Sequence, residues 1–213
     1  MTADLILASR SPRRRRLLAH LGIAFRVVVP TVEEDAAPPT PGRPEELAEA
    51  LALAKAEAVA AQERKGIVIA ADTIVVDGEA ILGKPADGSE AGAMLRRLRG
   101  RTHRVITALA VVDAAGGRKA VSHVVTAVRM RPYSDEEIAA YVARGEPLDK
   151  AGAYAIQDEQ FRPVASYDGC YCNVVGLPLR ALLTLLRRAG LDITPDSLEK
   201  LPSECGECPI VVE

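Results

Sequence analysis

The sequence has 213 residues and a formal net charge of −2, and 48% of its residues are hydrophobic. That hydrophobic content argues against disorder, and the near-neutral charge argues against a general nucleic-acid-binding surface. No apolar run approaches ~20 residues and the N-terminus lacks the pattern of a signal peptide, so we expect a soluble, cytoplasmic protein that does not contact membranes.

The first notable stretch is a turn that leads from a short apolar strand, Leu5 to Ala8, into a basic helix start. Ser11 is a typical N-cap and Pro12 a typical first helical residue, and Gly22 is expected to end this helix. The turn carries hydroxyl and guanidinium groups on Ser9, Arg13 and Arg14. Together with free backbone N–H groups they indicate a site for a multiply charged anion such as a polyphosphate. The alternative is a solvated basic helix start that binds nothing.

A loop and a long helix follow. Residues 25–29 predict a short strand, and the Pro-rich, acidic stretch from Thr31 to Pro44 predicts a loop. A strong helix is expected from Pro44 to about Arg64. Lys55 extends the Leu47–Leu51 row at i+4 spacing, which places it at the edge of the buried stripe. A snorkelling side chain is the commoner explanation of such a lysine.

The third strand contains an unusual carboxylate. Residues 67–76 are almost continuously apolar, and Asp72 interrupts them before Asp77-Gly78 turns the chain into a second strand through Leu82. A buried carboxylate is costly unless it is paired, hydrogen-bonded or bound to a metal. Asp72 is therefore a candidate functional group, or else a satisfied structural aspartate or an exposed strand end. Gly83-Lys84-Pro85 then presents a lysine on a tight, rigid segment.

The rest of the chain mixes strands and helices without strict alternation. We expect a helix capped by Ser89 that runs to Arg99, antiparallel strands at 102–112 and 118–131, a helix from the capping box at Ser134 to Gly145, a strand at 171–175 and a helix at 178–189. A polar stretch before the last strand adds two candidate ligand groups, Lys150 and Gln157. The fold class expected is a mixed, largely antiparallel α/β sheet flanked by helices, with two lobes around a cleft.

These stretches together resemble the Maf family of nucleotide pyrophosphatases, which shares its fold with the inosine-triphosphatase-like enzymes. The resemblance runs from Leu5 to about Leu186 and rests on an ordered set of motifs: Ala8-Ser9-Arg10-Ser11-Pro12-Arg13-Arg14, Glu33-Glu34, Ala71-Asp72-Thr73, Gly83-Lys84-Pro85, Gly145 to Gly152, and Asn173 to Leu179. On this basis we expect a Maf-like domain at residues 1–190 and a C-terminal tail at 191–213.

The resemblance implies hydrolysis of nucleoside triphosphates between the α- and β-phosphates, with a divalent cation (Mg²⁺ or Mn²⁺) as cofactor and a homodimer as the assembly. It implies that Asp72 is the general base, and Glu34 and Asp72 are the carboxylates expected near the metal. The branch of the family that acts on dTTP and UTP carries Arg, Thr and Gln at three selectivity positions. Here these positions are Arg13, Thr73 and Gln157.

The positive charge around the triphosphate is expected from Arg13, Arg14, Lys55, Lys84 and Lys150, with Ser9 as an additional donor. The sequence departs from the family where Asp158 to Pro163 replaces a Gly-rich stretch, and where Gly169-Cys170-Tyr171 replaces Gly-Ser-Tyr. Because this loop borders the expected base pocket, the same chemistry on 7-methyl-GTP or another modified purine stays open. A nucleotide-binding regulator is the second alternative, since the resemblance links the family to septum formation.

All four cysteines fall in two pairs, Cys170-x-Cys172 and Cys205-x₂-Cys208. A C-x-C pair on a strand puts both thiols on one face, and C-x₂-C in a tight turn can chelate a metal. Together the pairs can form a structural zinc site, a disulfide that joins the tail to the last strand, or neither, as unlinked reduced thiols. Disulfides are less common in a cytosolic chain.

Overall fold

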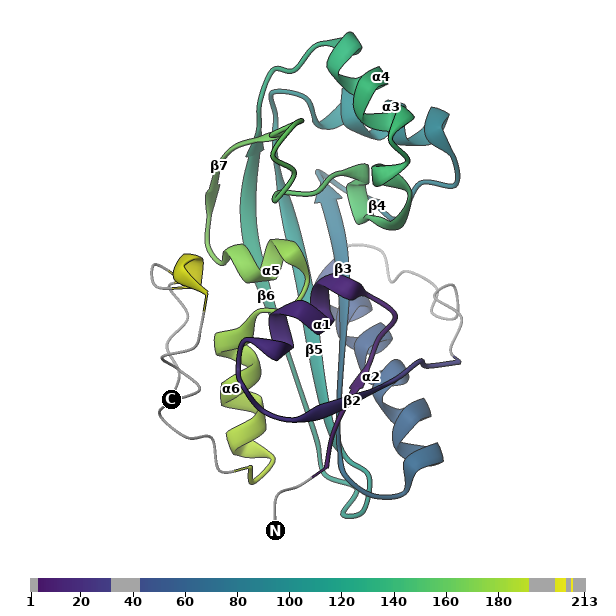
Figure 1. The fold of residues 1–213 in the computed structure, drawn as a ribbon, viewed down its shortest axis with the longest axis vertical. Coiled ribbons are helices and arrows are strands. Elements are labelled where there is room, and N and C mark those ends of the chain that lie inside the picture. Colours follow the sequence, from purple (N-terminus) through teal and green to yellow (C-terminus); the bar gives the residue numbers. More distant parts are fainter. Residues whose placement is uncertain (1–3, 32–42, 192–201, 206–207, 209–213) are drawn as a thin grey trace.

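A computed structural model describes residues 4–31, 43–191, 202–205 and 208. The acidic stretch with Glu34, and most of the tail expected at 191–213, lie outside the described residues. The described part is elongated, with a long twisted sheet as its spine and helices on both faces (Figure 1). The mixed α/β class expected from the sequence is confirmed.

Seven strands and six α-helices build the described part, with short 3₁₀ turns between them. The strands are β1 (Leu5–Ala8), β2 (Phe25–Val28), β3 (Ile67–Asp77), β4 (Ala80–Leu82), β5 (Thr102–Asp113), β6 (Lys119–Met130) and β7 (Val164–Asp168). The helices are α1 (Pro12–Ala19), α2 (Pro44–Glu63), α3 (Gly88–Leu98), α4 (Asp135–Ala143), α5 (Tyr171–Val175) and α6 (Leu179–Arg188). The 3₁₀ turns are η1 (Glu146–Asp149), η2 (Ala151–Ala153) and η3 (Ser203–Cys205).

The sheet has the strand order β2-β1-β3-β5-β6-β7, and β4 pairs with β3 beside this path. The strand β1 is parallel to both of its neighbours, and all the other pairs are antiparallel. The three long strands β3, β5 and β6 run the length of the molecule. They connect a lower part, which carries α1, α2 and α6, with an upper part, which carries α3 and α4 (Figure 1).

The strand β3 lies at the centre of the packing, which explains why its sequence is apolar on both faces. Helix α2 covers one face with small side chains such as Ala48, Ala52 and Ala56, and these allow the helix to approach the sheet closely. Helices α1 and α6 cover the other face with leucines. A separate apolar cluster, which includes Leu95 and Tyr141, holds the upper part together. Asp72 therefore lies on the strand that both parts share.

The structure corrects the sequence-based assignment near residue 170. Residues 171–175, expected as a strand, form the short helix α5, which ends at Gly176 with a φ of 116°. Because α5 is one turn long, its apolar and β-branched residues show no helical period, and the sequence pattern favoured a strand. The strand β7 was not predicted, because most of its residues are exposed on a sheet edge and it lacks alternation.

Two helix boundaries also differ from the prediction. Ser89 was expected to cap α3, but the N-cap is Asp87, whose carboxylate accepts a hydrogen bond from the Glu90 backbone at 2.9 Å. Helix α1 ends one residue earlier than expected, with His20 as the C-cap, although Gly22 does adopt a positive φ. The predicted Ser11 cap and the capping box at Ser134 are both confirmed.

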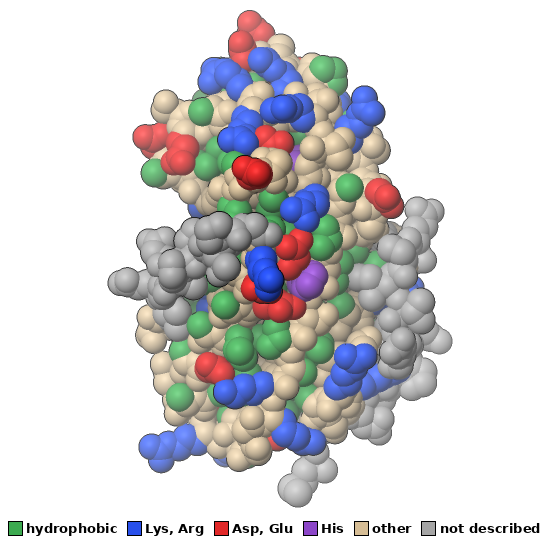
Figure 2. Space-filling model, turned by 180° about the vertical axis from the view of Figure 1, so that it is seen from behind, with side chains coloured by type: hydrophobic (Ala, Val, Ile, Leu, Met, Phe, Trp, Pro, Cys, Tyr) green, Lys and Arg blue, Asp and Glu red, His purple; other side chains and the backbone are tan. Residues whose placement is uncertain are grey.

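Charges of both signs are interspersed on the face seen in Figure 2, and no single basic field covers it. This distribution agrees with the near-neutral charge of the sequence. Within the described ranges, no helix has both the length and the apolar character required to span a membrane.

Candidate functional site

A cavity of about 940 Å³ opens beside the centre of β3. Its walls come from the β1–α1 turn, the middle of β3, helix α2, the segment after β4, η1 and η2, and the end of α5. Nine of the site residues expected from the sequence line it: Ser9, Arg13, Arg14, Lys55, Asp72, Thr73, Lys84, Lys150 and Gln157. Glu34, the tenth, lies outside the described residues.

The β1–α1 turn presents the start of α1 to the cavity. The Ser11 side chain accepts a hydrogen bond from the Arg14 backbone N–H at 3.3 Å, and the Ser9 hydroxyl accepts one from the Ser11 N–H at 3.1 Å. No acidic residue stands in the first turn of α1. The helix dipole and the arginines therefore add their positive potential at one place, which favours binding of an anion.

Asp72 forms a buried ion pair with Lys55. The Lys55 ammonium lies 2.6 Å from Oδ1 of Asp72, and the two residues are only 5% and 8% exposed. The interpretation of Lys55 as a snorkelling side chain is therefore wrong. Its side chain extends from α2 toward the buried strand β3. A lysine and a carboxylate buried against each other satisfy both charges, and removal of either one leaves the other uncompensated.

A chain of hydrogen bonds anchors Arg14 to the interior. Its Nε donates to the Gly176 carbonyl at 2.8 Å, and an NH2 group donates to the Thr73 hydroxyl at 3.0 Å. The Thr73 and Thr107 hydroxyl oxygens are 2.9 Å apart, and the Thr107 hydroxyl donates to the Asn173 carbonyl at 2.8 Å. With its side chain so held, Arg14 is preorganised at the cavity wall.

The backbone conformation of Gly176 allows its carbonyl to contact Arg14. Its φ of +116° lies in a region that residues with side chains rarely adopt. A Cβ added there would stand 3.3 Å from the Thr73 hydroxyl and 3.5 Å from Nε of Arg14. The glycine therefore allows α5 to approach Arg14 and Thr73 closely.

Asp149 bridges two cations that the sequence analysis assigned to phosphate binding. Its carboxylate lies 2.8 Å from Arg13 and 2.7 Å from Lys150, and Glu146 also contacts the Lys150 ammonium. Burial opposes ionisation of Asp149, but hydrogen bonds from Lys150 and Arg13 outweigh it and lower the pKa of the carboxyl. Sequence reasoning missed this bridge, because Asp149 is 136 positions from Arg13.

Lys84 and Gln157 are exposed residues of the cavity lining. The segment that carries Lys84 is held by a hydrogen bond from the Gly152 N–H to the Gly83 carbonyl, at 3.0 Å. Gly152 has a φ of +68° and packs against Val75 of β3. The segments that carry Lys84 and Gly152 are therefore fixed to each other and to β3.

Tyr154 was not singled out from the sequence, although it lines the cavity from the side of the upper part. Its hydroxyl lies 2.8 Å from Nε2 of His103, and both residues are buried. Burial lowers the pKa of His103 to about 4, against an opposing effect of Asp77. A histidine in β5 that contacts a tyrosine just after η2, 51 positions away, gives no recognisable sequence motif.

The carboxylates at the cavity fit a divalent cation that is shared with a substrate. Within the described residues, no group of three or more His, Cys, Asp or Glu side chains is already placed to hold a metal ion. Mg²⁺, however, is usually bound through one or two carboxylates together with substrate phosphates. Asp72 supplies such a carboxylate, and the oxygen chemistry suits Mg²⁺ or Mn²⁺.

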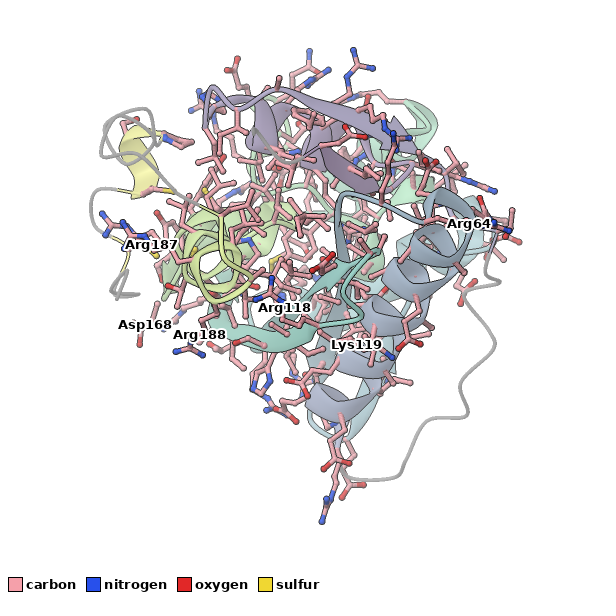
Figure 3. The ribbon with its side chains drawn as sticks, turned by 90° about the horizontal axis from the view of Figure 1, so that it is seen from below. Arg64, Arg118, Lys119, Asp168, Arg187 and Arg188 are labelled. Carbon is pink, nitrogen blue, oxygen red and sulfur yellow. The ribbon has the colours of Figure 1, made fainter. Side chains whose placement is uncertain are left out.

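Other basic side chains are arranged differently. Figure 3 shows Arg187 and Arg188 at the end of α6, Arg64 at the end of α2, and Arg118 and Lys119 at the start of β6, all at the lower end of the molecule. Arg118 pairs with Asp113 at 3.5 Å, and Lys119 pairs with Glu57 at 2.5 Å. These cations are spread over the surface, whereas those of the cavity face one space together with Asp72.

The mixed sheet and its cation-lined cavity define an α/β protein with a binding site suited to a phosphorylated ligand. Residues 4–189 match the family model described as Maf-like protein, and the chain therefore belongs to this family.

The chain is also similar to proteins named dTTP/UTP pyrophosphatase. The relative from Thermomicrobium roseum is 53% identical over 206 residues, which cover 97% of this chain and 93% of the relative. The relative from Symbiobacterium thermophilum is 52% identical and covers 89% of this chain and 96% of its own length. That from Pelotomaculum thermopropionicum is 46% identical, with 89% and 98% covered.

Proposed function

We propose that this protein hydrolyses nucleoside triphosphates, dTTP and UTP first among them, to the nucleoside monophosphate and pyrophosphate. The observation that carries the proposal is the placement of a buried carboxylate, Asp72, in the same cavity as the arginine-rich start of α1. The relatives named dTTP/UTP pyrophosphatase support the same reaction and the same bases.

The triphosphate binds where the cations face the cavity. Arg13 and Arg14 stand at the helix start, while Lys84 comes from the segment after β4 and Lys150 from the junction of η1 and η2. Guanidinium groups bind phosphate oxygens in bidentate fashion, and the free N–H groups of a helix start add further donors. The Asp149 carboxylate occupies Arg13 and Lys150 in this structure, so phosphate oxygens replace some of its contacts on binding.

Asp72 is the general base of the proposed reaction. It accepts a proton from a water molecule as the water oxygen attacks the α-phosphorus. The bond from the α-phosphorus to the bridging oxygen of the β-phosphate breaks, and pyrophosphate leaves with that electron pair. Lys55 holds the carboxylate in place through its ion pair, and the cations around the phosphates stabilise the charge of the leaving group.

A divalent cation, Mg²⁺ or Mn²⁺, bound to the triphosphate and to Asp72, with Glu34 as the second proposed ligand, would supply Lewis acidity and orientation. The ion pair with Lys55 restrains the Asp72 side chain. It therefore reduces the reorganisation that Asp72 requires as general base or as metal ligand.

Gln157 is the residue we propose to read the pyrimidine. It is exposed in the cavity lining, and its amide can donate and accept hydrogen bonds with a base edge. Thr73 and Arg13, the other two selectivity residues, already have partners in Arg14 and Asp149. We therefore assign Thr73 to the position of Arg14, while Arg13 keeps its proposed role at the phosphates.

The remaining parts of the proposal follow from the substrate and the family. Cytoplasmic location suits a nucleotide-hydrolysing enzyme, a homodimer is proposed as the assembly, and residues 1–190 are proposed as the catalytic domain with a tail at 191–213.

A nucleotide-binding regulator would use the arginines but would not require Asp72. The buried carboxylate in the cavity therefore favours an enzyme.

Pyrophosphate release across a panel of dTTP, UTP, CTP, GTP, ATP and 7-methyl-GTP, with Mg²⁺ or Mn²⁺, tests the function. We expect release of pyrophosphate from dTTP and UTP together with the monophosphate. Preference for 7-methyl-GTP would overturn the assigned base. Release of inorganic phosphate and a diphosphate would overturn the site of cleavage, and binding without turnover would favour a regulator.

A further inference from the structure

The four cysteines of the chain, which the proposed reaction does not use, come together at the base of α5. Cys170 is the N-cap of α5, Cys172 lies within it, and Cys205 belongs to η3, which packs against α5. These three residues are at most 1% exposed, and Cys208 is half-buried against the same apolar cluster. Two segments more than 30 positions apart therefore bring every thiol of the protein into one place.

Two of the thiols are in direct contact. The sulfur atoms of Cys172 and Cys205 are 2.9 Å apart, and Cys170 and Cys208 pack in the same apolar cluster. Non-bonded carbon atoms pack at ~3.5–4.0 Å, and sulfur is larger than carbon. A distance of 2.9 Å is therefore closer than packing alone accounts for, and buried thiols that act only as small apolar groups would not require it.

We propose that Cys170, Cys172, Cys205 and Cys208 bind one zinc ion as four thiolates and thereby fasten the C-terminal tail to α5. A C-x₂-C turn combined with a second cysteine pair is the usual ligand pattern of a structural zinc site. On binding, the four thiols release their protons to solvent and each sulfur donates an electron pair to Zn²⁺, which gives a site with a charge of −2. Arg180, whose Nε donates to the Cys205 carbonyl at 3.0 Å, stands beside this charge.

The sulfur atoms of Cys172 and Cys205 lie closer together than two ligands of one ion would, and within the described residues no group of three or more His, Cys, Asp or Glu side chains is already placed to hold a metal ion. Thiolates bind zinc at ~2.3 Å in a tetrahedron, which separates neighbouring sulfurs by about 3.8 Å. Cys172 and Cys205 therefore have to move apart by about 1 Å. Cys205 lies on the short η3 turn, bonded to the Pro202 carbonyl, so the movement requires only a small adjustment of that turn.

A disulfide between Cys172 and Cys205 is the competing arrangement. It explains two of the sulfurs but gives no reason for Cys170 and Cys208 to pack in the same cluster. The proposed substrates, nucleoside triphosphates, belong to the reducing cytosol. In that compartment, paired cysteines are more commonly metal ligands than disulfides. This preference for zinc rests on the proposed function, whereas the clustering of the sulfur atoms does not.

Hydrogen bonds connect the proposed zinc site to the wall of the cavity beside β3. Thr126 hydrogen-bonds the backbone of Cys170, and its hydroxyl accepts a hydrogen bond from the Asn173 side chain at 2.7 Å. Asn173 in turn holds Thr107, and Gly176, at the other end of α5, holds Arg14. The proposed metal therefore braces the helix that positions Arg14.

Metal analysis of the full-length protein, purified under reducing conditions without a metal-affinity step, tests the site. We expect one zinc ion per chain in the wild type and loss of that zinc in Cys205→Ser and in Cys208→Ser. Ser166→Ala, an exposed change on the neighbouring β7, is the matched control and should retain the zinc. Cobalt exchanged for zinc should show thiolate-to-cobalt charge-transfer absorption, which Cys208→Ser removes.

Two other outcomes would overturn the zinc site. Zinc-free protein with an intact mass lower by two hydrogens, together with an unaffected cross-link in Cys208→Ser, would show a Cys172–Cys205 disulfide. Zinc-free protein with four titratable thiols would show that the cysteines only pack. Because neither measurement depends on turnover, failure of the zinc site and failure of the proposed nucleotide hydrolysis remain distinguishable.

Discussion

The pairing of Lys55 with Asp72 is the feature from which the chemistry of the cavity follows. A lone carboxylate in an apolar strand would be strongly destabilising, but a lysine ammonium at 2.6 Å makes its burial tolerable. The pair also restrains the Asp72 side chain at the cavity wall. The same contact thus accounts for the presence of an aspartate in β3 and for the fixed position that its proposed role as general base requires.

Selectivity for the base is a property of single residues, and it can be tested at Gln157. In Gln157→Ala, we expect the preference for dTTP and UTP over CTP to fall by about 10-fold, because a lost hydrogen bond to a base edge is worth roughly 1 kcal/mol or more. The ratio of kcat/KM values for the three nucleotides measures this. Gln160→Ala is the control, since Gln160 is exposed, bonds Arg144 and is not among the residues that line the cavity. An unchanged ratio in Gln157→Ala would remove its proposed role.

At the level of helices and strands, the sequence was most informative where the local chemistry is specific. The Ser11 cap, the Ser134 capping box and the long apolar strand β3 were all predicted and confirmed. The prediction failed at α5, where one turn of helix is fixed by Asn173 contacts to distant strands and not by its own pattern. Tertiary contacts override local preference in so short an element.

The start of α3 offers a direct test of such a boundary. Because the Asp87 carboxylate accepts the Glu90 N–H, Asp87→Ala should lower the free energy of unfolding by about 1 kcal/mol. Ser89→Ala, at the residue that the sequence favoured as the cap, should change it by less than about 0.5 kcal/mol. Urea unfolding of both variants measures the difference. Equal losses in the two variants would show that the cap is misassigned.

On the scale of the whole molecule, burial of His103 makes stability depend on pH. Burial lowers the pKa of His103 to about 4, below the ~6.5 of an unfolded chain. The stabilising effect of the neutral ring is thus fully present above pH ~6.5 and is lost as the pH falls toward 4. The loss at pH 4 is about 3 kcal/mol for this residue.

Urea unfolding between pH 7 and pH 4 isolates this contribution when the wild type is compared with His103→Gln. The glutamine cannot titrate but can still bond the Tyr154 hydroxyl, so we expect a flatter dependence on pH in this variant. His20→Gln, an exposed change at the end of α1, should follow the wild type. A wild-type slope in His103→Gln would assign the pH dependence to other groups.

The sequence predicted the members of the site far better than their connections. Nine expected residues line one cavity: Lys55, Asp72 and Thr73 lie in the middle of α2 and β3, and the other six lie at or near the ends of elements that surround β3. The Lys55–Asp72 pair, the Asp149 bridge and the Tyr154–His103 contact were not predicted. Each of these joins residues whose proximity depends on how whole elements pack, and no local pattern encodes it.

Nucleotide turnover in two matched variants of β3 tests the central claim most directly. Asp72 and Asp77 lie on the same strand, and each is buried and ion-paired, Asp72 with Lys55 and Asp77 with Arg97. In Asp72→Asn we expect kcat for dTTP to fall by about 10²–10⁴-fold, the usual contribution of a general base, with nucleotide affinity retained. Asp77→Asn should keep near-normal turnover. Near-normal kcat in folded Asp72→Asn would contradict the account.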